Sequence, residues 1–572
     1  MEIQPIKKIA WLLVSVSFLP VSPLTAFAQN GKDVGSQEER FRRPKVLEVP
    51  ERKTIPIEIP PEGGLPPEAG NAPEITVSRI EVEGATLLPE KEKEQLIAPV
   101  VGRTVKLREL QQVALAVTRW YRGKGYVTSR ALVPAQAVDN GVVRFRVVEG
   151  KVGTVRFEGN KYFSTELLSH YVRAKGGEAL WLPNLEQTLG SLNAHPDRKA
   201  KLVLTPAAQP ETTDLVLQVT DCRPFHASYT VDTLGTKDTG WIRHSLQLSH
   251  GNLTGHDDQA TLRGLDTEFG GLYGGAFSYL RPVNSYGTLA TFEASGVKAK
   301  VGEDREALRA RGDSVTVSSG LVTPLMRRTH WEMEGTLGFD WKRIRTFEDE
   351  VSTSKDDLRV VRGGVNLLQD DRTGRSLFVQ ELRVGIPNVL GGSHGEDIAA
   401  SRAKAGGQFV RYLAQVLRLQ NLGVMGLQLA ARLSGQLSSD RLVSAEQFRL
   451  GGFETVRGYP EGVYLADYGY QSSLELRAPL DRWIPGPENS KRILNRLRRS
   501  VQLVGFWDFA EGFLKSARSG EDADERLSGV GCGFRLRPTS ESVLQLDFGW
   551  PIGDRDPEKD RPRIHLICAL GF

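Results

Sequence analysis

Residues 529–537 read Gly-Val-Gly-Cys-Gly-Phe-Arg-Leu-Arg, a strict alternation of apolar residues with glycine or arginine. Because successive side chains of a β-strand point to opposite faces, one face of this segment is apolar and the other is small or charged. Residues 427–434, 544–550 and 564–572 alternate in the same way. From residue 225 onward the pattern predicts strands without helices. We count roughly 16 of them, which lies near the porin range.

The connections between these predicted strands alternate between long and short. Outer-membrane barrels show this signature because their outer loops are extended and their periplasmic turns are tight, whereas a soluble β-sandwich has no reason to alternate. We therefore predict an all-β transmembrane barrel of about 16 antiparallel strands at residues 222–572. Residues 440–467 form its predicted sixth outer loop. Residues 481–499 should be a periplasmic turn but are long and basic, and the sequence assigns them no role.

The N-terminus carries a secretory signal. Lys7 and Lys8 precede an apolar segment, and Ala26-Phe27-Ala28 is a small-residue cleavage site, so residues 1–28 are the predicted signal peptide. No later stretch reaches the ~18 apolar residues of a membrane-spanning helix. Residues 29–74 are rich in proline, which favours an extended linker, and within them residues 36–43 could form a short helix.

An internal repeat lies between the linker and the barrel. Ile80-Glu81-Val82-Glu83-Gly84 recurs as Val155-Arg156-Phe157-Glu158-Gly159. Each copy begins with a strand, reaches a glycine turn, and continues with two helical stretches and two further strands. The sequence therefore predicts two α+β modules of β-α-α-β-β order, at residues 75–149 and 150–221.

Arg457 lies in the tetrapeptide Val456-Arg457-Gly458-Tyr459, inside the predicted sixth loop. An ionised group in a poorly hydrated barrel lumen needs a partner of opposite charge. In residues 501–508 the alternation places Trp507 toward lipid and Asp508 toward the lumen. We therefore predict that Arg457 and Asp508 form an ion pair in the lumen.

Other chemistries find little support in the sequence. The formal net charge of +4 gives no case for nucleic acid, and the three cysteines show no metal-ligand spacing. No HExxH, CxxC or G-x-S-x-G motif is present, and the nine histidines do not cluster. We predict a protein that is not an enzyme and that has no catalytic residues, no metal and no cofactor.

Together these features resemble the two-partner secretion transporters, the outer-membrane TpsB proteins of the ShlB/FhaC/HecB haemolysin secretion/activation family. The resemblance covers residues 75–572 and rests on Gly451-Gly452-Phe453 before the loop motif, on Phe506-Trp507-Asp508 and on the terminal Phe572. Smaller matches lie in the modules, at Gly125-Tyr126, Val133-Pro134, Val148-Glu149-Gly150 and Leu192-Asn193-Ala194-His195-Pro196. The resemblance implies that the modules are periplasmic POTRA modules and that loop six folds into the lumen, where Arg457 meets Asp508. It also implies a helix that plugs the pore, for which residues 36–43 are a short, proline-bounded candidate.

The resemblance further implies the export of one large β-rich exoprotein of haemolysin or adhesin type, recognised through its own N-terminal secretion domain. Strand addition to an exposed module edge is the physical route for capture. The candidate docking edges are residues 142–148 and 215–219, with Val142, Val143, Phe145, Val147, Leu215 and Leu217. The predicted partners are this exoprotein and outer-membrane lipid, without nucleic acid. The sequence does not set the oligomeric state, and we expect a monomer.

The predicted location is the outer membrane of a Gram-negative bacterium, with the modules in the periplasm. Two alternative functions remain open. An insertase of the same POTRA–barrel superfamily would assemble other barrels, but such proteins typically carry more modules. A passive porin or receptor needs no periplasmic modules, so the internal repeat argues against it. The sequence does not name the exported partner.

Overall fold

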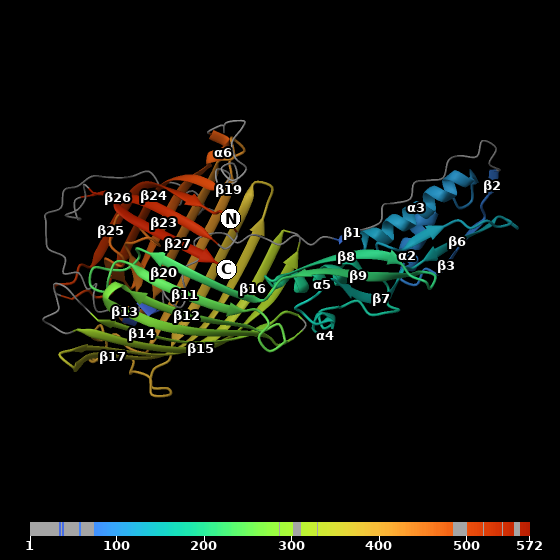
Figure 1. Ribbon diagram of the computed structural model, residues 1–572. Coiled ribbons are helices and arrows are strands. Elements are labelled where there is room, and N and C mark those ends of the chain that lie inside the picture. The colour runs from blue at the N-terminus through green and yellow to red at the C-terminus, as the bar shows by residue number, and fades with distance from the viewer. Residues whose placement is uncertain are drawn as a thin grey trace, which may run out of the picture.

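The computed structural model of the protein describes residues 34–35, 37–38, 57–58, 74–284, 286–300, 310–328, 330–483, 500–518, 520–539, 542–553 and 561–572. A β-barrel forms one end of the elongated molecule, and two smaller α+β modules extend from it (Figure 1). Among the described residues, no helix has the length and apolar character needed to cross a membrane. The predicted signal peptide and residues 484–499 of the basic turn lie outside the described residues.

Sixteen antiparallel strands of the described residues form one closed barrel, which confirms the predicted count and fold class. The strands follow one another around the wall in chain order. They are β10 (Phe225–Asp232), β11 (Arg243–His250), β12 (Gln259–Thr267), β13 (Leu272–Pro282), β14 (Leu289–Lys300), β15 (Arg311–Arg328), β16 (Trp331–Glu348), β17 (Val351–Asp370), β18 (Gly374–Gly385), β19 (Phe409–Asn421), β20 (Gln428–Ser438), β23 (Tyr468–Pro479), β24 (Val501–Phe513), β25 (Asp524–Leu536), β26 (Val543–Pro551) and β27 (Arg563–Gly571). A short helix, α6 (Leu480–Trp483), follows β23.

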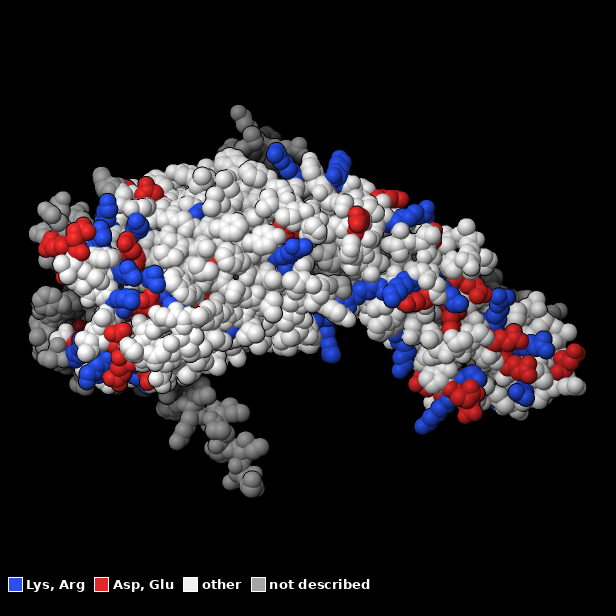
Figure 2. Space-filling view, turned by 90° about the horizontal axis from the view of Figure 1, so that it is seen from below, with Lys and Arg blue, Asp and Glu red and all other residues white. Residues whose placement is uncertain are grey.

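The barrel wall has an apolar outer face and a polar inner face. On β24, Leu503 and Trp507 are 47% and 41% exposed, whereas Val504 and Asp508 are 3% and 0% exposed. Figure 2 shows a broad belt of the barrel surface that is largely without charged side chains, between the charged loop end and the charged modules. An outward-facing apolar band of this kind is what a lipid-embedded barrel requires, so the predicted strand parity is confirmed on β24.

The barrel closes where its first strand meets its last. Residues Ser228–Asp232 of β10 pair with Ile567–Gly571 of β27. The terminal residue extends this seam, because Phe572 N–H donates to the Ala227 carbonyl at 2.8 Å and Ala227 N–H donates to the Phe572 carbonyl at 3.1 Å. The C-terminal strand is therefore part of the closed wall up to its last residue.

The first module packs an amphipathic helix on a three-stranded sheet. α3 (Leu107–Gly123) buries one stripe of apolar side chains, including Leu110, Val117 and Tyr121, in a core shared with Phe145 of β6 (Val142–Val148). The Tyr121 hydroxyl also donates to Glu149 at 2.7 Å, which ties the helix to the end of β6. The other elements are β2 (Glu74–Thr76), β3 (Arg79–Glu83), α2 (Glu90–Ile97), β4 (Thr104–Lys106) and β5 (Arg130–Leu132).

The second module has the β-α-α-β-β order of the first but no counterparts of its short strands β2 and β4. Its elements are β7 (Lys151–Glu158), α4 (Thr165–Ser169), α5 (Leu182–Ala194), β8 (Arg198–Pro206) and β9 (Thr212–Asp221). The hydroxyl of Ser164 accepts from Leu167 N–H at 3.1 Å, which caps α4 as the sequence predicts. A two-residue strand of the linker, β1 (Ile57–Glu58), adds in parallel to β8, so the sheet order is β1-β8-β9-β7.

The cysteines provide a test of the strand parity. Cys532 on β25 and Cys568 on β27 share the lipid-facing parity of their strands, and β26 lies between them. All three cysteines are free thiols, and Cys222 is exposed at the junction between the modules and the barrel. We expect a membrane-impermeant charged maleimide to label Cys222 in permeabilised cells and to leave Cys532 and Cys568 unlabelled in the folded protein. Strong labelling of either barrel thiol would contradict the parity of the last strands.

Candidate functional site

Loop six, residues 439–467, connects β20 to β23 and folds into the barrel lumen. It contains a short 3-10 turn (Ser444–Glu446) and a hairpin of β21 (Phe448–Leu450) and β22 (Tyr464–Ala466). Its apolar side chains pack on inward-facing residues of β24 and β25 in one cluster, made by Phe448, Leu450, Val456, Tyr459, Ala466, Ala510 and Leu527. The loop therefore has a packed core of its own against the inner wall.

Arg457 projects from this loop into a set of wall carboxylates. Its Nε and Nη2 lie 2.7 and 2.8 Å from the two oxygens of Asp508, so the pair is bidentate. Its main-chain N–H also donates to Asp508, at 3.1 Å. Arg457 is 3% exposed and Asp508 is 0% exposed. The structure thus brings together the two residues that the sequence pairs.

Two further carboxylates surround the same guanidinium. Nη1 of Arg457 lies 2.6 Å from Glu475 Oε1 on β23 and 3.2 Å from Asp547 Oδ2 on β26. The face of the guanidinium stacks on Phe506, with Cζ 3.5 Å from the ring centroid. Bidentate pairing and stacking are the contacts for which a planar arginine is suited and a lysine is not. The sequence analysis missed Glu475 and Asp547, although both share the inward parity of their strands.

Glycines allow the loop motif to approach the wall. Gly458 has a φ of +106°, and a Cβ there would lie 2.8 Å from Pro551 N. On the wall opposite, a Cβ on Gly549 would lie 2.6 Å from Gly458 N. Any larger residue at either position would push Arg457 away from its carboxylates. Val456 and Tyr459, the flanking residues of the motif, are buried in the loop core.

The outer end of loop six is tied to two neighbouring loops. Asp467 is 0% exposed and receives Arg402 Nη1 at 2.6 Å from the β18–β19 loop and Lys515 N–H at 2.7 Å from the β24–β25 loop. Asp467 also accepts from Leu442 N–H, at 2.9 Å, within loop six itself. One buried carboxylate therefore joins three outer loops.

Helical residues of the N-terminal segment also lie inside the barrel. Residues 34, 35, 37 and 38 are helical, and the Glu38 carboxylate receives hydroxyl hydrogen bonds from Ser295, Ser314 and Thr316 of β14 and β15. The predicted helix at residues 36–43 overlaps these positions, and the remainder of that range lies outside the described residues.

One of the two predicted docking edges, residues 215–219, is wrong, and the other, residues 142–148, is open along part of one side. Residues 142–148 form β6, which pairs with β3 on one side through residues 142–146 and with β5 on the other side only through residues 146–148. Residues 215–219 lie in β9, between β7 and β8. Leu215 and Leu217 are therefore paired on both sides and cannot accept an added strand. Val142, Val143 and Phe145 pair with β3 but have no strand on their other side among the described residues, where β5 reaches only Val147 and its two neighbours. The outer sides of β3 and β7 carry no neighbouring strand among the described residues.

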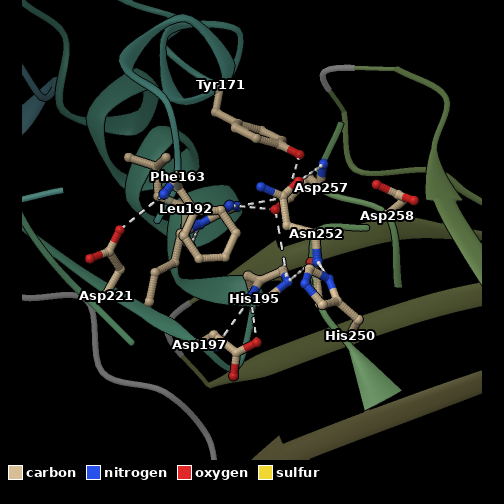
Figure 3. Close-up of polar contacts among 12 residues, drawn as sticks. Phe163, Tyr171, Leu192, His195, Asp197, Asp221, His250, Asn252, Asp257 and Asp258 are labelled. Carbon is tan, nitrogen blue, oxygen red and sulfur yellow. Dashed lines mark hydrogen bonds and ion pairs between the residues drawn. The ribbon is translucent and has the colours of Figure 1, made fainter. Parts of the chain in front are cut away.

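A buried polar cluster joins the second module to the barrel (Figure 3). Arg198 of β8 is fully buried and makes a bidentate pair with Asp257 of the β11–β12 turn, at 2.5 and 2.7 Å. Tyr171 donates to the same Asp257 carboxylate at 2.6 Å. Burial and the charge of Asp257 raise the pKa of Tyr171, so its hydroxyl stays protonated and can donate.

His195, from the Leu192–Pro196 motif, lies in the same cluster. Its Nδ1 accepts from Asp197 N–H at 3.1 Å, so its Nε2 carries the proton and donates to the Gly251 carbonyl at 2.5 Å. Burial lowers the pKa of His195, which favours this neutral tautomer. The motif thus holds the second module against the first periplasmic turn of the barrel.

The substitution Asp257→Asn tests this junction. Removing one charge of a buried pair costs about 3–5 kcal/mol, because Arg198 would remain buried without its counter-charge. We expect a broader distribution of distances between a spin label on the second module and one on the barrel, measured by electron–electron double resonance. Asp139→Asn, at an exposed position of the first module, is the matched control. An unchanged distribution would show that other contacts hold the module.

Comparisons with known proteins agree with this architecture. Residues 75–150 match the POTRA domain, ShlB-type, and residues 211–494 match the haemolysin secretion/activation protein ShlB/FhaC/HecB. The heme/hemopexin transporter protein HuxB of Haemophilus influenzae is 22% identical over 596 residues, covering 100% of both chains. The outer membrane transporter CdiB of Escherichia coli is 26% identical over 435 residues, covering 74% of this chain and 71% of that protein.

Solved structures show the same fold. CdiB from Escherichia coli superposes with a TM-score of 0.71 at 23% identity, covering 91% of this chain and 94% of that one. BamA from Haemophilus ducreyi, lacking its POTRA domains 1–3, gives a TM-score of 0.52 at 12% identity over 87% of this chain and all of that one. The modules, the barrel, loop six and these matches agree, and the chain belongs to the ShlB/FhaC/HecB haemolysin secretion/activation family, the outer-membrane transporters of two-partner secretion.

Proposed function

We propose that this transporter captures its exoprotein at the POTRA modules and exports it by displacing loop six from the lumen. Two-partner secretion across the outer membrane is the activity of its family, whose members are transporters. The observation that carries the mechanism is the buried set of contacts around Arg457, which holds an outer loop inside the pore. A chain that passes through the barrel needs the space that this loop occupies.

The contacts of loop six suit a closed state that can be released. They consist of side-chain ion pairs, hydrogen bonds and packing, and the hairpin of β21 and β22 does not pair with the strands of the wall. Buried ion pairs contribute little net free energy relative to hydrated charges, although losing one partner is costly. Hydration of the site by an entering chain would therefore weaken the hold on Arg457 without breaking any wall strand.

Capture requires an open strand edge, and β7 is the best candidate that the second module offers. β9 lies along one side of β7, and on its other side Lys151 forms a bridge with Ala179 and Val152 exchanges main-chain hydrogen bonds with Gly177 and Glu178. Residues 155–158 have no strand on that side among the described residues, so they can pair with an extended segment of the exoprotein through main-chain hydrogen bonds. The corresponding strand of the first module, β3, is shorter but is also an edge strand, so we propose that capture uses both modules.

The N-terminal helix is proposed to share the lumen with loop six in the closed state. Glu38 is 2% exposed and forms hydrogen bonds with three wall hydroxyls, so the helix is held by a specific polar contact. We expect a monomeric transporter in lipid. The insertase alternative is not favoured, because the family match covers both the module and the barrel.

Co-expression tests the proposal. The gene beside this one in its source genome should encode a large β-rich exoprotein with an N-terminal secretion domain. Producing both proteins in a secretion-negative host should place the exoprotein in the medium, and omitting the transporter should leave it in the periplasm. Secretion that is independent of the transporter would reject the proposed function.

A further inference from the structure

Loop six carries a second buried charge, Glu446, which takes no part in the Arg457 cluster. Its side chain is fully buried, with Oε1 2.6 Å from Lys342 Nζ and Oε2 2.9 Å from Arg411 Nη1. Oε2 also lies 3.5 Å from Arg383 Nη1. The Glu446 carbonyl accepts from Arg411 at 2.7 Å and from Gln436 at 3.2 Å. Four strands of the wall, β16, β18, β19 and β20, therefore converge on one residue of the loop.

The charge pattern here is the reverse of that around Arg457. There a single guanidinium meets three wall carboxylates, whereas here a single carboxylate meets three wall cations. Cations buried close together repel one another unless an anion lies among them. Glu446 supplies that anion for Lys342 and Arg411, whereas Arg383 also pairs with Glu381 of its own strand at 2.5 Å. The position of residues 444–446 and the burial of Lys342 and Arg411 therefore depend on each other.

The residue before Glu446 touches the N-terminal helix. Val34, Ile344 and Ala445 belong to one buried apolar cluster. A Cβ on Gly35 would lie 2.6 Å from Ile344 Cδ1 and 2.9 Å from Ala445 Cβ, so the helix backbone rests directly on these two side chains. Ile344 and Lys342 are two residues apart on β16 and share its inward face. One strand therefore holds both the loop, through Lys342, and the helix, through Ile344.

We propose that Glu446 is a positioning residue that holds in place the part of loop six on which the N-terminal helix packs. By pinning residues 444–446 to β16, β18 and β19, it holds Ala445 against Gly35, so departure of the helix and release of this part of loop six occur together. The inference rests on the proposed role of loop six as the element that closes the pore. It adds a second anchor, at a site where the helix, the loop and the wall meet.

Planar-bilayer recordings of the full-length protein test whether Glu446 keeps the N-terminal helix in the lumen. Glu446→Gln keeps the size of the side chain but removes its charge, and Gly35→Val places a branched side chain where no Cβ fits. We expect each to raise the ratio of open to closed time by at least about tenfold, which corresponds to ~1.4 kcal/mol. The matched control is Glu350→Gln, whose exposed carboxylate pairs with Arg311 at 3.0 Å, and it should behave as wild type.

Combined variants distinguish coupling from two independent defects. If the same contacts hold the helix and this part of the loop, Glu446→Gln combined with Gly35→Val should raise the open fraction no more than the stronger single variant does. Glu446→Gln combined with Arg457→Ala should instead multiply the two single effects. Independent, multiplying effects of Glu446→Gln and Gly35→Val would overturn the proposal, as would a wild-type open fraction for Glu446→Gln.

Folding and the proposed function are controlled separately. Heat-modifiable migration in gels reports whether each barrel is folded. Should Glu446→Gln fail to fold, Lys342→Met removes a cation of the same contact, and a wild-type open fraction for that variant would then overturn the proposal. If Arg457→Ala leaves the open fraction at the wild-type value while Glu446→Gln raises it, the proposed role of Arg457 is rejected and the proposed role of Glu446 is retained.

Discussion

Arg457→Ala is expected to abolish most secretion while the barrel remains folded in the membrane. The substitution removes the cation that Asp508, Glu475 and Asp547 share. Glu475 keeps its pair with Arg477 and Asp547 keeps its pair with Arg535, but Asp508 loses its bidentate partner. Losing one partner of a buried pair costs about 3–5 kcal/mol. Because loop six has no strand pairing with the wall, that free energy is enough to change the fraction of molecules in which the loop keeps its place in the lumen. The wall itself keeps its closed ladder, so gel migration of the folded barrel should not change.

Secretion of the exoprotein into the medium, measured against its periplasmic pool, checks this expectation. Asp508→Ala should show the same defect, because it removes the bidentate partner of the same guanidinium. Arg526→Ala is the matched control, since Arg526 forms an exposed pair with Glu511 at 2.7 Å. Wild-type secretion by both Arg457→Ala and Asp508→Ala would show that the lumen pair has no part in export.

Deletion of residues 75–149 is expected to weaken capture of the exoprotein by at least about 100-fold while the channel persists. The first module has its own core, and the cluster around Arg198 and Asp257 holds the second module to the barrel without it. The deletion therefore removes the β3 edge and the outer half of the periplasmic arm (Figure 1), and leaves the pore intact.

Affinity for the isolated secretion domain and conductance in planar bilayers give independent readings of this deletion. Conductance within the wild-type range would show that the barrel is inserted and closed. Unchanged affinity would place capture on the second module or the barrel. That outcome would favour β7, whose residues 155–158 remain in the shortened protein.

The barrel and the lumen pair could be predicted because both depend on a period-two pattern. Alternation along residues 501–508 places Asp508 inward whatever the neighbouring strands are, and the structure has the same parity. Glu475 and Asp547 carry the same signal, but parity alone does not say which inward carboxylates share one level of the lumen. That depends on strand register, which no single strand encodes.

The docking strands show a different limit. The segments Val142–Val148 and 215–219 have regular strand patterns because each belongs to a strand that lies between two others in its sheet. Regular alternation therefore marked the interior of the sheet, whereas an edge strand such as β5, with three residues, leaves a weak pattern. Glu446 lies in an irregular loop without any period, so only the folded chain reveals its three cations.

The seam between β10 and β27 bears on how the chain is made. Leu566 N–H donates to Thr233 Oγ1 across 333 positions of sequence, and Phe572 completes the pairing. Joining such distant segments is slow because the whole intervening loop must close first. Until the final residues arrive, both seam strands present unpaired edges that attract other chains. Loss of residues 567–572 would remove this pairing and leave the edge of β10 open to other chains.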